Sequence, residues 1–147
     1  MTPAIPIRPA VAADLDAARS WLAAAGLPSE DLTAAHMADF LVALGEQRAV
    51  GMIGIEQFAA VGLLRSLVVD PHCRNAGLGR QLVDALEKIA ADRGITELWL
   101  LTIDAEQYFV GCGYETRPRA DAPAAIQETP EFASLCPGDA VLMRKHL

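Results

Sequence analysis

The chain has 147 residues, of which 52% are hydrophobic and 21% are charged, a balance that excludes a disordered chain. Twelve basic and nineteen acidic side chains give a net charge of −7, which disfavours nucleic acid as a partner. The apolar stretches end before the roughly 20 residues that a membrane span needs, so we expect no membrane partner. The length fits one domain, and we expect a single domain over residues 1–147.

The first predicted elements are a strand over residues 5–9, at a sheet edge because of its prolines, and a helix over 14–25 that Gly26 ends. A second helix is predicted over 32–38. Two apolar runs, 40–44 and 48–58, are joined by Gly45 to Gln47 and predict a hairpin. A third run over 61–69 completes an antiparallel meander.

A βαβ unit follows. Apolar residues at helical spacing predict a helix over 77–93 with Gly94 as its stop, and the apolar run 97–103 predicts a strand parallel to 61–69. A helix over 105–112, a strand beginning at Gly113, an irregular segment with at most one short helix over 118–138 and a closing strand over 140–145 complete the chain. The expected fold class is α/β, a mixed sheet flanked by helices.

Cysteine and histidine usage limits the remaining chemistry. The three cysteines are odd in number and widely spaced, which favours a reducing compartment over a disulfide framework. The first nine residues contain no apolar run typical of a signal peptide, so we expect a cytoplasmic protein. No C-x-x-C or H-x-x-x-H pair occurs, and we expect no metal site.

The segment from Val69 to Arg80 lies at the strand-to-helix turn of the βαβ unit. Gly77 and Gly79 have no Cβ, so a ligand can approach the main chain, and successive N–H groups at a helix start form an anion site. Arg74 and Arg80 add positive charge. The glycines fit neither a Walker A loop nor the G-x-G-x-x-G pattern, and a plain tight turn is the alternative.

The longer string resembles the acetyl-CoA loop of the GNAT N-acetyltransferases, [RQ]-x-x-G-x-[GA], with Arg74, Gly77 and Gly79 at the defined positions. Residues 7–15, 67–71 and 108–114 resemble other parts of that family. The resemblance implies the GNAT acyl-CoA N-acyltransferase fold, acetyl-CoA as co-substrate and no metal. Residues 63–67, 119–126 and 131–137 resemble the small acetyltransferases associated with arsenic resistance. That subgroup implies a small amino-acid-like amine as substrate, organoarsenicals among them.

The resemblance also implies roles for individual residues. The pantetheine arm would pair with the backbone of one strand, and the pyrophosphate would meet the N–H groups of the loop. The implied cofactor-binding residues are Leu67, Val68, Val69, Arg74, Asn75, Ala76, Gly77, Leu78, Gly79 and Arg80.

Acetyl transfer needs a base for the amine and a proton donor for the leaving thiolate. Glu56 is a plausible base, with a solvated carboxylate as the alternative. Phe109 stands where the family has its tyrosine acid. Tyr108 lies one residue earlier, about 100° away around a helix, which disfavours Tyr108 as a replacement for the tyrosine acid. Tyr114 or water is the alternative proton donor.

Two polar residues interrupt the apolar run 61–69. Arg65 and Ser66 should point to opposite faces of the strand, and an arginine facing a cleft suits a bidentate grip on a substrate carboxylate. A solvated side chain is the alternative for Arg65. Cys136 is expected to pack in the interior.

Three functions stay open. The first is an enzyme that acetylates a small amine. The absence of the usual tyrosine motivates a second, a non-catalytic acetyl-CoA sensor, and the acidic charge permits a third, a protein or peptide N-acetyltransferase. A homodimer is also open, because closing strands in this fold often pair between subunits.

Overall fold

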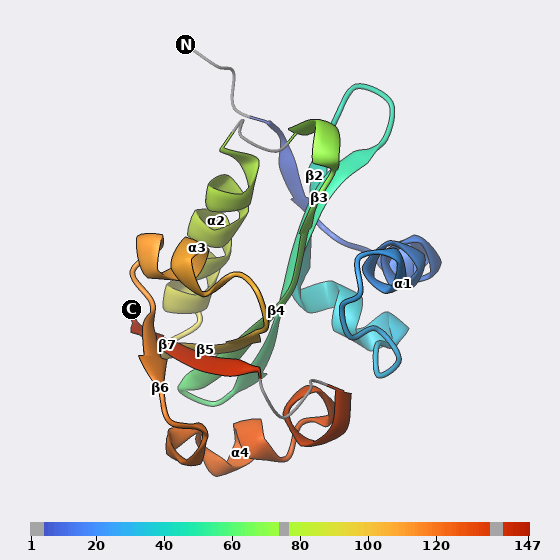
Figure 1. The fold of residues 1–147 in the computed structure, drawn as a ribbon. Helices are drawn as coiled ribbons and strands as arrows, with labels where there is room; N and C mark the ends of the chain where they lie inside the picture. Colours follow the sequence, from blue (N-terminus) through green and yellow to red (C-terminus); the bar gives the residue numbers. More distant parts are fainter. Residues whose placement is uncertain (1–4, 74–76, 136–139) are drawn as a thin grey trace. The chain divides into compact units, whose positions relative to one another are not determined.

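Seven strands form one mixed sheet in the order β1-β2-β3-β4-β5-β7-β6 (Figure 1). The computed structural model describes residues 5–73, 77–135 and 140–147. Helices interrupt the strands along the chain, which confirms the predicted α/β mixed sheet. Contacts group the chain into a first unit, Met1–Ile55 with Ser66–Leu86, and a second unit, Glu56–Arg65 with Glu87–Leu147. The single domain stays a prediction.

The hairpin of the first unit forms as predicted. Strand β1 (Ile7–Pro9) pairs antiparallel with β2 (Phe40–Leu44), which pairs antiparallel with β3 (Ala49–Phe58). The Gly45 N–H donates to the Arg48 carbonyl at 2.8 Å and closes the turn between β2 and β3. Strand β1 stands at one end of the strand order, as its prolines indicated.

Apolar side chains fix the helices of the first unit. Helix α1 (Leu15–Ala24) follows the short 3₁₀ turn η1 (Ala12–Asp14) and buries Leu22 against residues of β2 and β3. Figure 1 shows α1 and the beginning of α2 on opposite sides of β2 and β3. Alternating β3 residues serve the two faces: Met52 belongs to the core under α1, whereas a Cβ on Gly51 would lie 2.9 Å from Leu82 of α2.

The predicted helix over 32–38 differs from the structure. A 3₁₀ helix, η2 (Ala34–Asp39), forms instead and begins later. Thr33 is extended, with φ −127°, and its N–H donates to His36 Nδ1 at 3.0 Å. This local hydrogen bond fixes the start of η2 at Ala34, a competition between side chain and backbone that apolar spacing does not reveal.

The βαβ unit is confirmed. Strand β4 (Val61–Val69) is followed by the 3₁₀ turn η3 (Pro71–Cys73), α2 (Leu78–Asp92) and β5 (Glu97–Thr102). Strands β4 and β5 run parallel, with Val61 opposite Glu97 and Leu63 opposite Trp99. Gly94, with φ +83°, follows the end of α2 as expected of a helix stop.

Strand pairing in the second unit places the closing strand inside the sheet. Strand β7 (Val141–His146) pairs antiparallel with β5 on one side and with β6 (Glu115–Arg117) on the other. Helix α3 (Glu106–Gly111) precedes β6. Since β7 has a strand on each side, pairing between subunits through β7 has no open edge, and the homodimer stays a prediction.

The segment 118–138 contains more helical structure than predicted. Within its described part it forms η4 (Arg119–Asp121), α4 (Ala124–Gln127) and a π-helical turn, η5 (Glu131–Leu135). Ala122 and Ile126 are buried against Leu63 of β4, Trp99 of β5 and Leu142 of β7. This packing explains how a segment with weak helical periodicity becomes ordered, because it covers one face of these strands.

Candidate functional site

The first candidate site is the glycine loop, by which we mean residues 70–80 of the first unit. Asp70 is 4% exposed, accepts the His72 N–H at 2.9 Å and forms an ion pair with Arg48. Its own N–H donates to the Val50 carbonyl at 2.8 Å. These bonds fix the beginning of the loop to the hairpin of β2 and β3.

Gly77 begins α2. Its φ is +78°, and its carbonyl accepts the Gln81 N–H at 3.0 Å. No described atom lies within 4 Å of the position that a Cβ would take. The N–H groups in the first turn of a helix have no acceptor within the helix, so this turn suits an anion.

The side chains around the glycine loop differ in burial and in ion pairing. Leu78 is buried, whereas Arg80 lies on the surface and pairs with Asp84 at 3.1 Å. Arg74, Asn75 and Ala76 lie outside the described residues. Phosphate binding by Gly77 to Arg80 stays a prediction.

Strand β4 leads into the glycine loop, and its geometry changes at Ser66. Ser66 has φ 62°, a left-handed value that interrupts the regular pleat of the strand. Beyond it, Val68 is buried in the core of the first unit, and Leu67 and Val69 are half-buried. The predicted pairing of Leu67 to Val69 with pantetheine concerns backbone groups of this segment, and it stays a prediction.

The second candidate site is the arginine cluster, by which we mean Glu56, Arg65 and Glu131 of the second unit. Arg65 Nη1 lies 3.1 Å from Glu56 Oε2, and Arg65 Nε lies 3.1 Å from Glu131 Oε2. The Arg65 side chain is 0% exposed, that of Glu131 5% and that of Glu56 13%. Arg65 is therefore buried between two carboxylates, and the alternative of a solvated arginine is wrong.

Strand alternation explains how the cluster assembles. Val61 and Leu63 contribute to the apolar core of the second unit, and Arg65 follows at the same spacing along β4. Phe58 contributes to that core from β3, and Glu56 precedes it by two residues. Glu131 comes from η5, in the segment that covers this core.

A substrate carboxylate would share the Arg65 guanidinium with Glu56 and Glu131. The guanidinium has five N–H donors in a planar fork, which lets one arginine serve more than one carboxylate. Substrate recognition by Arg65 and Ser66 stays a prediction.

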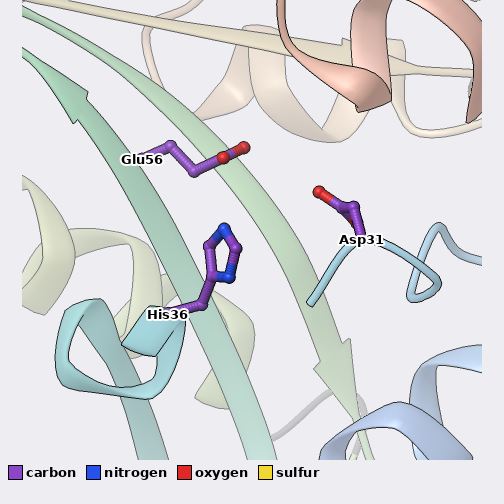
Figure 2. A group of neighbouring side chains, drawn as sticks. All are labelled: Asp31, His36 and Glu56. Atoms are coloured by element: carbon purple, nitrogen blue, oxygen red, sulfur yellow. The ribbon is translucent and has the colours of Figure 1, made fainter. Parts of the chain in front are cut away.

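Figure 2 shows Asp31, His36 and Glu56, which come from the loop after α1, from η2 and from β3. Asp31 and His36 belong to the first unit, with one ligand atom of each within 4.8 Å of the other, whereas Glu56 begins the second unit. His36 Nδ1 accepts the Thr33 N–H, so the neutral imidazole carries its proton on Nε2. A protonated nitrogen is a donor and not a metal ligand, which disfavours a metal on that atom.

The aromatic residues of α3 point in different directions, as the helical geometry predicted. Tyr108 is 42% exposed, whereas Phe109 is 6% exposed and contacts the rings of Tyr108 and Tyr114 edge-on. The Tyr114 hydroxyl donates to Glu87 Oε2 at 3.0 Å, and Lys145 Nζ lies 2.8 Å from the other oxygen of that carboxylate. Tyr114 thus belongs to a partly buried polar network with Glu87 and Lys145.

Glu131 is the residue of these sites that the sequence did not assign. It lies 66 positions after Arg65 in a segment expected to be irregular, so no local spacing links the two. The sequence signal that could have indicated Glu131 is its position next to Phe132 in a largely apolar stretch. A carboxylate that such a stretch buries needs a charged partner, because buried carboxylates are rare unless paired. Cys136, expected to pack, lies outside the described residues.

The mixed sheet, its parallel βαβ unit and the glycine before α2 agree with the acyl-CoA N-acyltransferase fold that the sequence resemblance implied. The model of the acetyltransferase (GNAT) family matches residues 12–114, which include the hairpin, the glycine loop and α3. The chain belongs to the GNAT acetyltransferase family.

Relatives agree with this assignment. An uncharacterized N-acetyltransferase of Chlorobaculum tepidum is 32% identical over 92 residues, which cover 62% of this chain and 59% of that protein. The chain thus spans less than two thirds of that relative.

Within the described residues, none of the helices combines the length and hydropathy that a membrane span requires.

Solved structures share the fold. N-acetylglutamate synthase of Neisseria gonorrhoeae, complexed with coenzyme A and N-acetyl-glutamate, matches with a TM-score of 0.85 and 19% identity, over 100% of this chain and 36% of that chain. A Mycobacterium tuberculosis protein in complex with CoA matches with a TM-score of 0.80 and 19% identity, over 97% of this chain and 99% of that chain. At these identities the likeness concerns the fold.

Proposed function

We propose that the protein transfers the acetyl group of acetyl-CoA to the amine of a small, amino-acid-like substrate. Family membership supports the transfer, and the CoA complexes of structural neighbours support acetyl-CoA as the co-substrate. N-acetyl-glutamate, bound to the Neisseria gonorrhoeae synthase, is a product of the proposed kind. The free thiols of Cys73 and Cys112 are consistent with a reducing compartment, and we include a cytoplasmic location in the proposal.

The observation that supports this function most is the ion pair that holds Glu56 against the buried Arg65. Its carboxylate lies near the end of β3, is 13% exposed and pairs with the buried Arg65 guanidinium. A carboxylate held by a buried cation keeps a fixed position, and a positioned base is what deprotonation of a substrate ammonium requires. Glu56 would accept the proton directly or through a water, after which the neutral amine attacks the thioester carbonyl.

The proton donor for the leaving thiolate of coenzyme A is either Tyr108 or water. Tyr108 has the hydroxyl nearest in sequence to the family's tyrosine position, and its partial exposure is compatible with reaching a bound ligand. Water is the alternative, because the thiolate is a fairly good leaving group. Tyr108 is the candidate acid among the side chains of the protein, but we propose that water supplies this proton in most turnovers, so that loss of the Tyr108 hydroxyl has a small effect.

The substrate side of the proposal rests on Arg65 and Ser66. A substrate that carries a carboxylate beside its amine, or an arsenic oxyanion in place of that carboxylate, could share the guanidinium of Arg65. The likeness of residues 119–126 and 131–137 to arsenic-resistance acetyltransferases supports an organoarsenical amino acid as one such substrate.

The test is acetyl-CoA turnover by the purified chain against free amino acids, organoarsenical amino acids and short peptides. We expect turnover with small amino acids and little with peptides. Glu56→Gln should lower kcat by about 10²–10⁴-fold, the range typical of a general base, while the Kd for acetyl-CoA stays unchanged. Turnover restricted to peptides would assign the protein to peptide acetylation instead.

A non-catalytic acetyl-CoA sensor is the second candidate, and one observation favours it. Phe109 occupies the family's tyrosine position, and its ring is buried between Tyr108 and Tyr114. A sensor would bind acetyl-CoA in calorimetry but show no turnover with any acceptor of the panel, and Glu56→Gln would then change neither measurement.

A further inference from the structure

The arginine cluster contains one more carboxylate than the proposed chemistry uses. Glu56 and Glu131 contact the same guanidinium through different nitrogens, Nη1 and Nε, each at 3.1 Å. With all three groups ionised, the cluster has a net charge of −1 in a buried environment. Such burial costs free energy, and well-packed apolar residues would often be at least as stable, so the arrangement calls for a reason other than stability.

The two carboxylates differ in their access to solvent. The Glu131 side chain is 5% exposed and belongs to the covering segment, whereas Glu56 is 13% exposed at the end of β3. Glu131 is thus the more enclosed partner. Its bond to Nε restrains the guanidinium near the base of the fork, and the orientation of the fork determines where Nη1 holds Glu56.

We propose that Glu131 is a positioning residue for acetyl transfer: by holding Arg65 at Nε, it fixes the guanidinium that orients Glu56. This inference rests on the proposed function, in which Glu56 is the base. Glu131 does not touch the reacting atoms. Its effect passes through Arg65, and it reaches the reaction only while position 56 carries a carboxylate.

Removal of Glu131 should therefore lower kcat without affecting the cofactor. A charge-assisted hydrogen bond is about twice as strong as a neutral one, so the near-isosteric Glu131→Gln should lower kcat by about tenfold. Glu131→Ala removes the acceptor altogether and should lower kcat by about a hundredfold. The Kd for acetyl-CoA should stay within about twofold of wild type in both variants, because the glycine loop belongs to the first unit.

A double-mutant cycle separates positioning from mere stabilisation. In a Glu56→Gln background, neither substitution of Glu131 should lower kcat further. Glu128→Gln, the same chemical change at an exposed position in the same segment, is the matched control and should leave kcat unchanged. If Glu131→Ala does not fold, Glu131→Gln carries the cycle alone, with the melting temperature of each variant recorded.

The possible outcomes distinguish the inference about Glu131 from the proposed function. A kcat loss that disappears in the Glu56→Gln background supports the inference. Unchanged kcat in both folded Glu131 variants, or an equal loss in both backgrounds, overturns it while leaving the proposed function intact. Failure of the wild-type chain to turn over any amine overturns the proposed function, a result visible before any variant is made.

Discussion

The glycine loop of the first unit and the arginine cluster of the second unit are built from different parts of the chain. The glycine loop is predicted to bind an anion through backbone groups that are close together in sequence, and Gly77 within it has a left-handed φ. The arginine cluster uses three side chains from β3, β4 and η5, brought together over a long stretch of sequence. The two candidate sites thus differ in kind. One would bind charge through backbone N–H groups that are close in sequence, and the other through side chains that are far apart in sequence.

The difference has an energetic side. N–H groups at a helix start can bind water when no other acceptor is present, so they cost little free energy. In the arginine cluster, each ionised group depends on its partners, because removal of one leaves the others charged in a buried position. We therefore expect loop variants to lose binding while remaining folded, and cluster variants to lose stability as well.

Removal of the central cation is the largest expected effect. Arg65→Ala leaves the carboxylates of Glu56 and Glu131 without their shared cation, and the free energy of unfolding should fall by about 3–5 kcal/mol, the range for breaking a buried ion pair. Urea denaturation followed by circular dichroism measures the change.

The control is Arg117→Ala. Arg117 pairs with Asp121 at 2.6 Å in the same unit, but both side chains are about one third exposed. This variant should lose about 1 kcal/mol or less. Equal losses at positions 65 and 117 would contradict the contrast between buried and exposed pairs. The triple variant Glu56→Leu, Arg65→Met and Glu131→Leu replaces all the charges of the cluster by apolar groups and should recover most of the stability.

A substitution in the glycine loop should act on binding. Gly77→Asp places a Cβ and a negative charge where the anion is expected, and the Kd for acetyl-CoA should rise by at least about a hundredfold, or about 2.7 kcal/mol. Isothermal titration calorimetry measures the change, and a melting curve shows whether the variant folds.

Gly94→Asp separates ligand binding from backbone strain. Gly94 has φ +83°, close to the +78° of Gly77, and a Cβ at either position meets no described atom within 4 Å. The two variants should therefore lose similar stability, and only Gly77→Asp should lose binding. Near-normal affinity in Gly77→Asp would remove the loop from the site.

Local features of the fold were predictable from the sequence. The hairpin, the βαβ unit and the helix stop at Gly94 follow from apolar spacing and glycine, and Leu15–Ala24 and Leu78–Asp92 lie within the predicted helices. The 3₁₀ form of η2 was missed because it depends on the Thr33–His36 hydrogen bond, which leaves no periodic signal.

The candidate sites also differ in whether local sequence could predict them. Gly77 could be proposed from the sequence because its predicted role depends on its own backbone and on the helix that follows it. Alternation along β4 predicted that Arg65 and Ser66 point to opposite faces, but the carboxylate from η5 that pairs with Arg65 depends on how residues 119–135 fold over the strands. Glu131 is therefore visible only in the structure, where its carboxylate lies 3.1 Å from Arg65 Nε.

A smaller effect is expected from α3. If the chemistry depends on the arginine cluster, Tyr108→Phe should lower kcat by less than about tenfold, since a full general acid contributes about 10²–10⁴-fold. Tyr108 is exposed, whereas the buried position is that of Phe109. Steady-state kinetics at saturating acetyl-CoA measures kcat.

The companion variant is Phe109→Tyr, which restores the family's residue in a buried position. A rise in kcat would show that the site accepts a tyrosine acid. A nearly inactive Tyr108→Phe with normal acetyl-CoA affinity would identify Tyr108 as the acid and would show that α3, in addition to the cluster, carries the chemistry.

The smallest effect concerns a half-exposed ion pair that contrasts with the buried cluster. Arg8 Nη1 lies 2.9 Å from Asp14 Oδ2, and the Val11 N–H donates to the same carboxylate at 2.8 Å. The hydrogen bond from Arg8 lowers the pKa of Asp14 below its ordinary value of 3.8. Asp14→Asn should lower the free energy of unfolding by about 1 kcal/mol or less at neutral pH, because solvent screens the pair and the amide still accepts a hydrogen bond.

The pH dependence of this difference follows from the direction of the shift. A carboxyl group whose pKa is lower in the folded state stabilises the fold at pH values above its unfolded pKa, and this contribution disappears as the pH falls through the folded value. The stability advantage of wild type over Asp14→Asn should thus be constant above about pH 5 and should be lost as the pH falls below 3.8 and through the lower pKa of the folded state. Urea titrations at several pH values measure it. An advantage that persists at low pH would show that Asp14 acts through its shape as a cap, and a difference of several kcal/mol would show that exposure does not separate this pair from the arginine cluster.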